Sequence, residues 1–227
     1  MSTMNLELKD GVHVLSLTNH DAENTFTLDV MHEYLAAFDE VEKYDGNTSL
    51  LICCDHEKTF STGINLKWMM AQNPVGQKVF VQALETVLVR LALLSAPTIV
   101  AINGNAYAGG AIFSSSADFR LMRSDLGRFC FPEVDIKIAF TPIMSDIIDL
   151  LPNKQALKQL VLTGKPFTGV ECEANNIVDS IHSAEELMPA ALELAKILGQ
   201  KDRKTYTTIR NLLRPKLLKH AKSLGLN

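Results

Sequence analysis

The sequence predicts an α/β protein in which strand-then-helix units fill the first two thirds of the chain and helices fill the rest. Two continuous apolar runs, residues 49–54 and 97–102, have the composition of strands buried on both faces, and each is followed by a helical pattern. From Pro142 onward almost every periodic segment has helical spacing. A chain of 227 residues can bury one sizeable core. We therefore expect a core domain over residues 1–195 and a helical C-terminal extension over residues 196–227.

The elements of the first two thirds follow from local patterns. Residues 6–8 and 12–17 predict a hairpin around the Asp10-Gly11 turn, and Thr27 can cap a helix that runs to about Lys43. Apolar residues on more than one side of residues 77–94 predict a helix packed between layers. The remaining elements expected here are a short helix at 109–117 and strands at 119–122 and 127–131.

In the last third we expect helices at residues 144–151, 154–162, 184–198 and 206–223, with Pro215 interrupting the last one. This part ends in a strongly basic segment, in which a single acidic residue, Asp202, accompanies Lys201, Arg203, Lys204, Arg210, Arg214, Lys216, Lys219 and Lys222. The segment has no aromatic residue besides Tyr206, which disfavours a nucleic-acid arm. A solvated helix face is the simplest interpretation.

Composition excludes several classes of protein. The hydrophobic fraction of 47%, the charged fraction of 21% and the net charge of −4 are those of an ordinary globular protein and predict no binding to nucleic acid or membrane. The first residues lack the pattern of a signal peptide, the last lack a peroxisomal address, and no apolar run could span a bilayer, so we expect a cytoplasmic protein. The four cysteines show no C-x-x-C spacing and the six histidines no metal-ligand spacing, so we expect free thiols and no metal.

Two glycine-containing turns, at residues 60–66 and 103–110, each follow a buried strand and lead into a helical pattern. Backbone N–H groups at the start of a helix are unpaired and favour an anion. Two such ends that converge would supply two donors to one developing oxyanion. Neither turn has the glycine spacing of a nucleotide-phosphate loop, and the serines at 114–116 lack the G-x-S-x-G frame of a nucleophile. The turns favour an oxyanion site over both alternatives.

The residues in and around these turns resemble the crotonase, or enoyl-CoA hydratase/isomerase, family. The segment FSTGINLKWM (60–69) is similar to the family's F-[SA]-[AT]-G-x-D-[IL]-K-x-M, and PTIVAINGNAYAGG (97–110) is similar to P-x-[IV]-A-x-[IV]-x-G-x-[AC]-x-G-G-G. The segments ADFR (117–120), LTGKPF (162–167) and IVD (177–179) resemble further family motifs in the same order. The likeness covers nearly the whole chain.

The resemblance implies a spiral of repeated ββα units, acyl-CoA thioesters as substrates, assembly as a homotrimer or a dimer of trimers, and no cofactor apart from the coenzyme A of the substrate. It implies the backbone N–H groups of Ile64 and Gly109 as oxyanion donors. It further implies substrate or coenzyme A contacts at Ser61, Gly63, Lys67, Gly110 and Ile112. For Lys67 a solvated helix lysine is an equal alternative. The basic C-terminal segment could likewise face coenzyme A.

The positions at which this chain departs from the family pattern indicate which of the family's reactions it would catalyse. Hydratases of the family carry two glutamates, and the position of the first is Ile112 in this chain, whereas the second is matched by Glu133 in the segment FPEVD. Hydration needs two acid/base groups, while moving a double bond from C3 to C2 needs one. The sequence therefore resembles the Δ3-Δ2-enoyl-CoA isomerases, with Glu133 as the single acid/base. Thioester hydrolysis or decarboxylation, and acyl-CoA binding without catalysis, remain the alternatives.

We expect apolar neighbours of Glu133, namely Phe131, Pro132, Ile112 and Phe140, to raise the pKa of its carboxyl group. Asp135 is a competing carboxylate, since it would share a face with Glu133 if the segment were extended. Asn65 stands where the family often has aspartate, and we expect it to keep a turn through a side-chain hydrogen bond.

Overall fold

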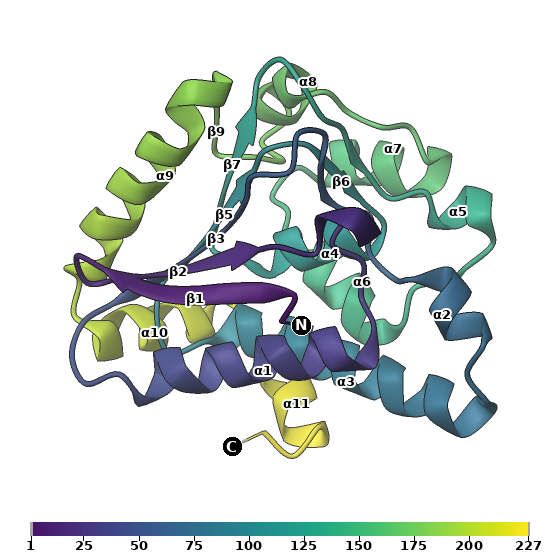
Figure 1. The fold of residues 1–227 in the computed structure, drawn as a ribbon, viewed down its shortest axis with the longest axis horizontal. Helices are drawn as coiled ribbons and strands as arrows, with labels where there is room; N and C mark the ends of the chain where they lie inside the picture. Colours follow the sequence, from purple (N-terminus) through teal and green to yellow (C-terminus); the bar gives the residue numbers. More distant parts are fainter. Residues whose placement is uncertain (1, 227) are drawn as a thin grey trace.

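A computed structural model describes residues 2–226, and within them the strands form two separate sheets (Figure 1). The larger sheet has the strand order β1-β2-β3-β5-β7-β9, and the smaller sheet has the order β4-β6-β8. The strands are β1 (Met4–Lys9), β2 (Val12–Leu17), β3 (Ser49–Cys54), β4 (Thr59–Ser61), β5 (Thr98–Ile102), β6 (Asn105–Tyr107), β7 (Phe119–Arg123), β8 (Phe129–Cys130) and β9 (Ser180–His182).

The larger sheet is parallel except for the β1–β2 hairpin. The hairpin turns at Asp10 and Gly11, both of which have a positive φ, as the Asp-Gly signal predicts. Every residue of β3 and of β5 is buried, which confirms the expectation from their continuous apolar runs. β2 and β3 lie side by side with Leu17 opposite Cys54, so the segments that follow both strands start at the same edge.

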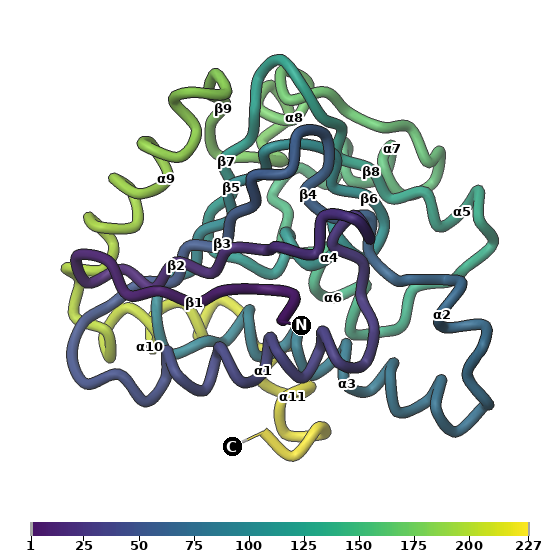
Figure 2. Tube along the Cα trace, in the orientation of Figure 1, coloured from purple at the N-terminus to yellow at the C-terminus, as the bar shows by residue number. Residues whose placement is uncertain are grey.

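The smaller sheet consists of three short parallel strands (Figure 2). The sequence predicted β8 within residues 127–131, but it gave no signal for β4 and β6, whose three residues each are too few for an alternating pattern to be visible. Three units, which begin with β3, β5 and β7, each add one strand to the larger sheet, one to the smaller sheet and then a helix, whereas both strands of the first unit, β1 and β2, belong to the larger sheet. This confirms the repeated ββα architecture.

The helices agree with the expected ones apart from their ends and a few short additions. They are η1 (His20–Ala22), α1 (Leu28–Lys43), α2 (Leu66–Met70), α3 (Pro74–Leu93), α4 (Gly109–Ser116), α5 (Glu133–Ile136), α6 (Pro142–Ile148), α7 (Lys154–Thr163), α8 (Gly169–Ala174), α9 (Ala184–Gly199), α10 (Arg203–Leu212) and α11 (Pro215–Ser223). α3 begins earlier than expected because the Asn73 side chain accepts the Gly76 N–H and Pro74 occupies the first turn. The expected helix at 206–223 is two helices, and the second begins at Pro215.

The core lies on both faces of the larger sheet. Alternate residues of β3 point to opposite faces, so Leu50 and Ile52 pack into one apolar cluster and Leu51 and Cys53 into the other. α9 covers the second cluster, whereas α1 and α3 lie on the first side (Figure 1). α9 continues to Gly199, past the division expected at residue 195.

Three arginines of the basic C-terminal segment are anchors for the last helices, so a solvated face is the wrong interpretation for them. Arg210 and Arg214 form ion pairs with the buried carboxylate of Asp118 at 3.3 and 2.9 Å. Arg203 donates hydrogen bonds to the carbonyl oxygens of Tyr44 and Val41 at the C-terminal end of α1. Cations satisfy the unpaired carbonyls at such an end, so these contacts fix α10 and α11 against the core.

Candidate active site

The carboxyl ends of the three strands of the smaller sheet carry the residues that the sequence singled out. β4 ends at Ser61 and leads into the turn with Gly63, β6 ends at Tyr107 and leads into Gly109, and β8 is followed closely by Glu133. Parallel strands end at the same edge of their sheet, and Ala108 extends the pairing by donating its N–H to the Cys130 carbonyl at 3.0 Å. The smaller sheet therefore brings both glycine turns and the glutamate segment to one edge (Figure 2).

The two glycine turns touch each other through their backbones. A Cβ atom built on Gly63 would lie 2.4 Å from the Gly109 nitrogen, and one built on Gly109 would lie 3.3 Å from the Ile64 nitrogen. A Cβ on Gly110 would clash with the Ser61 carbonyl oxygen, because the start of α4 packs directly on β4. Only glycine allows this approach. The contact places the two expected oxyanion donors, the N–H groups of Ile64 and Gly109, close together.

Neither donor N–H group has a hydrogen-bond acceptor within residues 2–226. Gly109 is the first residue of α4, where the helix geometry leaves the N–H unpaired and the helix dipole favours negative charge. The Ile64 N–H points away from the bridge with Phe26, whose hydrogen bonds run through Gly63 and Asn65. Two unpaired donors that lie together can stabilise an oxyanion.

Side chains and backbone from residues 24–26 hold the first turn in place. The Phe26 N–H donates to the Gly63 carbonyl at 2.7 Å, and the Asn65 N–H donates to the Phe26 carbonyl at 3.0 Å. The Ser61 hydroxyl is fully buried, donates to the Asn24 carbonyl and accepts the Gly63 N–H. In this structure Ser61 thus braces the turn. Sequence patterns gave no signal for Asn24 or Phe26, because their partners lie far along the chain.

Two further residues shape the turns. The Asn65 side chain accepts the Trp68 N–H at 2.9 Å and caps α2, which confirms its expected structural role. Ala108 has φ 49° and ψ −123°, a conformation that glycine favours. The family pattern has its first of three glycines at this position, so the alanine was a visible departure that sequence reasoning missed. Ala108 holds strain directly beside the Gly109 donor.

Glu133 is the buried acid of the site. Its side chain is only 7% exposed, and its Oε2 atom is buried without a hydrogen-bond partner among the described residues. Burial raises the pKa of its carboxyl group to about 7, although its own backbone N–H acts in the opposite direction. Phe131 is fully buried, and its ring lies 6.2 Å from that of Phe140. The expected rise in the pKa is confirmed, with burial as its cause.

Asp135 does not share the position of Glu133. The segment forms the short helix α5 instead of an extended strand, so the two carboxylates point in different directions and Asp135 is exposed. The expectation that Asp135 and Glu133 share one face is therefore wrong.

Two other residues that the sequence singled out differ in their exposure. Ile112 is buried on α4, and Lys67 is exposed on α2.

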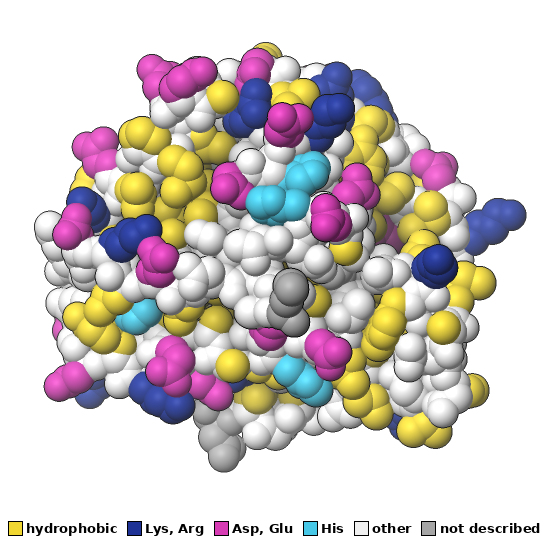
Figure 3. Space-filling view, viewed as in Figure 1, with side chains coloured by type: hydrophobic (Ala, Val, Ile, Leu, Met, Phe, Trp, Pro, Cys, Tyr) yellow, Lys and Arg dark blue, Asp and Glu magenta, His cyan; other side chains and the backbone are white. Residues whose placement is uncertain are grey.

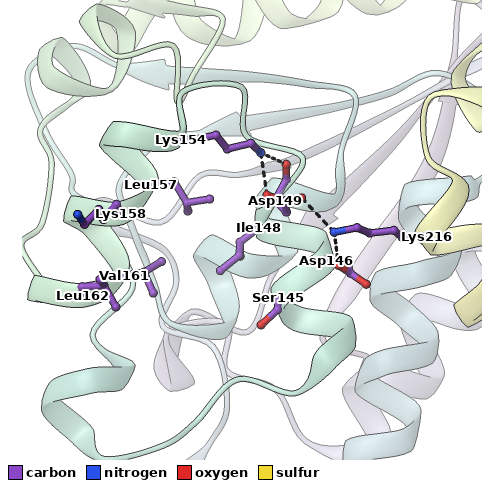
Figure 4. A pocket seen from close by; sticks show the side chains of 10 residues that line it. All are labelled: Ser145, Asp146, Ile148, Asp149, Lys154, Leu157, Lys158, Val161, Leu162 and Lys216. Atoms are coloured by element: carbon purple, nitrogen blue, oxygen red, sulfur yellow. Dashed lines mark hydrogen bonds and ion pairs between the residues drawn. The ribbon is translucent and has the colours of Figure 1, made fainter.

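A hollow with a volume of about 610 Å³ lies between α6 and α7 and is lined by none of the residues of the glycine turns (Figure 4). Its lining includes the apolar Ile148, Leu157 and Val161, and most of its charges are paired, since Lys216 contacts both Asp146 and Asp149 while Lys154 contacts Asp149. Neither of its two acids is buried, in contrast to Glu133. The edge of the smaller sheet is thus the better candidate active site.

None of the helices within residues 2–226 is both long and apolar enough to cross a membrane.

Comparison with known proteins gives relatives over nearly the full chain. The family described as enoyl-CoA hydratase/isomerase matches residues 7–224. The chain is 33% identical to enoyl-CoA delta isomerase 3 of Arabidopsis thaliana over 93% of this chain and 92% of the relative. It is 28% identical to a short-chain-enoyl-CoA hydratase of Clostridium acetobutylicum, over 84% of this chain and 72% of that one. A crystal structure of a probable enoyl-CoA hydratase from Mycobacterium tuberculosis shares the fold with a TM-score of 0.89 at 21% identity, covering 98% of this chain and 92% of the other.

Proposed function

Since the chain belongs to the enoyl-CoA hydratase/isomerase family, we propose that it converts 3-enoyl-CoA to trans-2-enoyl-CoA with Glu133 as its single acid/base. The observation that carries the proposal is the pairing of one buried glutamate, whose Oε2 has no partner, with the apolar Ile112 at the other family position. The relative named as a delta isomerase supports the same reaction.

The proposed reaction transfers one proton twice. The Glu133 carboxylate removes a proton from C2 of the substrate, and the electron pair moves onto the thioester oxygen as a dienolate. The N–H groups of Ile64 and Gly109 stabilise this oxygen, because they lie close together and have no competing acceptor among the described residues. The protonated Glu133 then returns the proton at C4, which leaves the double bond between C2 and C3.

The environment of Glu133 suits both halves of this cycle. A pKa of about 7 lies near neutral pH, so the carboxylate is basic enough to accept the proton and the acid strong enough to return it. An unpartnered Oε2 is available to a substrate proton, whereas a carboxylate held by an ion pair would be a weaker base. The proposed reaction therefore depends on the raised pKa that burial gives to Glu133.

Ile112 argues against hydration by this chain, although a hydratase is among its relatives. Addition of water needs a group that activates water and another that manages the proton at C2. An isoleucine side chain can do neither, and it is 2% exposed on α4. The exposed Asp135 cannot replace it, because it points away from the buried carboxyl group.

The test is turnover of purified protein on 3-enoyl-CoA. Formation of the conjugated 2-enoyl thioester is followed by its absorbance, with Glu133→Gln and the matched control Asp135→Asn beside the unchanged protein. We expect Glu133→Gln to lower kcat by about 1000-fold or more, with acyl-CoA binding kept, and Asp135→Asn to change it little. Full turnover by Glu133→Gln would overturn the assignment. Release of free coenzyme A without isomerisation would favour thioester hydrolysis, and tight binding without turnover would favour a non-catalytic acyl-CoA-binding protein.

The same proposal covers the remaining expectations. The reaction moves a proton and a double bond, so it needs no cofactor beyond the coenzyme A of the substrate.

We propose a homotrimer or a dimer of trimers. The proposal is supported by apolar side chains on and just after α10 that are exposed to solvent, namely Ile209, Leu212 and Leu213, with exposed fractions of 57, 74 and 77%. Light scattering of the purified chain tests this, and a monomeric mass would contradict it. A cytoplasmic location stays a prediction for cell fractionation.

A further inference from the structure

The ends of β2 and β3 bring three metal-binding side chains together away from the oxyanion donors. Leu17 and Cys54 are opposite each other in the sheet, so η1, which follows β2, meets the residues that follow β3. Ligand atoms of His20, Cys54 and Asp55 all lie within 4.8 Å of one another. We propose that these three residues bind a divalent transition-metal ion of the zinc type.

The spacing of the three side chains is close to that of a metal site. His20 Nε2 and Asp55 Oδ1 are already 3.0 Å apart. Ligand atoms around a tetrahedral zinc ion are about 3.3–3.5 Å from one another, given bonds of about 2.0–2.3 Å. Side-chain movements of roughly 1 Å would therefore close the site. The two strand ends that carry the ligands are fixed by the sheet.

Two N–H groups are directed at the sulfur of Cys54 and oppose the effect of burial, which raises the pKa of its thiol. The sulfur accepts the His56 N–H at 3.2 Å and the Asn24 side-chain N–H at 3.1 Å. Donors directed at a sulfur atom stabilise its thiolate form, which is the form that binds metals. The thiol makes only a long contact of 3.7 Å to the Thr59 carbonyl, so the bond to the metal must offset mainly the cost of ionising a buried thiol. Metal binding would release that proton to solvent and form a metal–sulfur bond.

His20 and Asp55 complete a set with one nitrogen, one sulfur and one oxygen ligand. Imidazole and thiolate favour zinc and its neighbours over calcium or magnesium, and the thiolate and carboxylate together balance two positive charges. His20 Nε2 also lies 3.1 Å from the Leu17 carbonyl, and binding through Nε2 would give up this hydrogen bond. We therefore expect a dissociation constant in the micromolar range, with water at the open position.

The neighbouring His56 is not a ligand, although its ring centroid lies 5.5 Å from that of His20. Its Nδ1 accepts the N–H groups of Lys58 and Thr59, which keeps the ring proton on Nε2. Histidine side chains gather beside acidic ones near the centre of the face in Figure 3, and solvent reaches this region because Asp55 is 89% exposed at its side chain. The side chains of His20 and Asp55 are thus open to solvent, whereas Cys54 is only 5% exposed.

Cobalt substitution tests the proposal on the full chain. Metal-free protein is titrated with Co²⁺, and a near-ultraviolet charge-transfer band reports a cobalt–thiolate bond; competition with Zn²⁺ gives the affinity for zinc. We expect one saturable site, loss of the band in Cys54→Ser, and at least about tenfold weaker binding in Asp55→Asn and in His20→Gln. Matched controls are Cys53→Ser, on the opposite face of β3, and His32→Gln on exposed α1 surface, which should leave band and affinity unchanged.

The outcomes of these titrations distinguish a specific metal site from nonspecific metal binding. Absence of saturable binding overturns the proposal, and so does a charge-transfer band that persists in Cys54→Ser or disappears in Cys53→Ser. If Cys54→Ser unfolds, the exposed Asp55→Asn still decides, because unchanged affinity in that variant contradicts a three-ligand site. Zinc should also raise the Tm of the unchanged protein but not that of Asp55→Asn.

Discussion

Gly63 and Gly109 are in direct backbone contact, although they are far apart in the sequence. A Cβ atom on Gly63 would lie 2.4 Å from the Gly109 nitrogen and 2.7 Å from its Cα. Real Cβ atoms do not approach backbone so closely, so the contact exists only because position 63 is glycine, while a Cβ at position 109 would be tightly packed at 3.1 Å from the Gly63 Cα. This contact sets the spacing of the two donors, and the first prediction follows from it.

Replacement of Gly63 by alanine should separate the donors. We expect Gly63→Ala to lower kcat/KM on 3-enoyl-CoA by about 100-fold or more, since one oxyanion donor is typically worth that much. The matched control is Gly11→Ala, because Gly11 has the same φ of 80° but no atom within 4 Å of an added Cβ. The control should lose about 1 kcal/mol of stability and keep its activity. Equal activity of the two variants would contradict the proposed role of the contact.

The rate should follow the ionisation of Glu133. Its carboxyl group must be ionised to accept the C2 proton, and burial raises its pKa to about 7. We therefore expect kcat/KM to rise with pH and to level off above about pH 7 to 8. Steady-state rates across this range measure it, and Asp135→Asn should keep the same midpoint. A profile that is flat from about pH 5 to 8 would show that another group is the base.

Relief of the strain at Ala108 should stabilise the protein. Its φ of 49° and ψ of −123° cost an alanine about 1–3 kcal/mol, more than the roughly 0.4–1 kcal/mol that glycine adds to the entropy of the unfolded chain. We expect Ala108→Gly to raise the free energy of unfolding by about 1 kcal/mol in urea titrations. Ala71→Gly, at an exposed residue with ordinary helical angles, should lower it by about 0.5–1 kcal/mol. Destabilisation by both variants would show that Ala108 is not strained.

Loss of the Asp118 carboxylate should loosen the C-terminal helices. Asp118→Asn leaves the guanidinium groups of Arg210 and Arg214 without their buried counter-charge. We expect a loss of about 3–5 kcal/mol in the free energy of unfolding. Asp125→Asn breaks an exposed pair with Arg123 and should cost less than about 1 kcal/mol. A small effect of Asp118→Asn would show that α10 and α11 dock mainly by apolar contacts.

The sequence by itself determined the elements whose signals are local. Residues 49–54 and 98–102 could only be buried strands, because a continuous apolar run needs cover on both faces. The Thr27 cap, the Asp10-Gly11 turn and the helical break at Pro215 depend on nearest neighbours, so all three were predicted. The glycine spacing, Ile112 and Glu133 were likewise visible in the chain itself.

Tertiary structure alone decided which of these groups meet and what charge each one carries. The short strands β4, β6 and β8 gain their stability from pairing with one another, and β4 and β6, with three residues each, have no local signal in the sequence. Only their shared edge brings Gly63, Gly109 and the Glu133 segment together. The basic segment looked solvated until Asp118, which lies far away in the sequence, was placed beside Arg210 and Arg214. Burial and counter-charges depend on contacts between distant segments, and a linear sequence does not show such contacts.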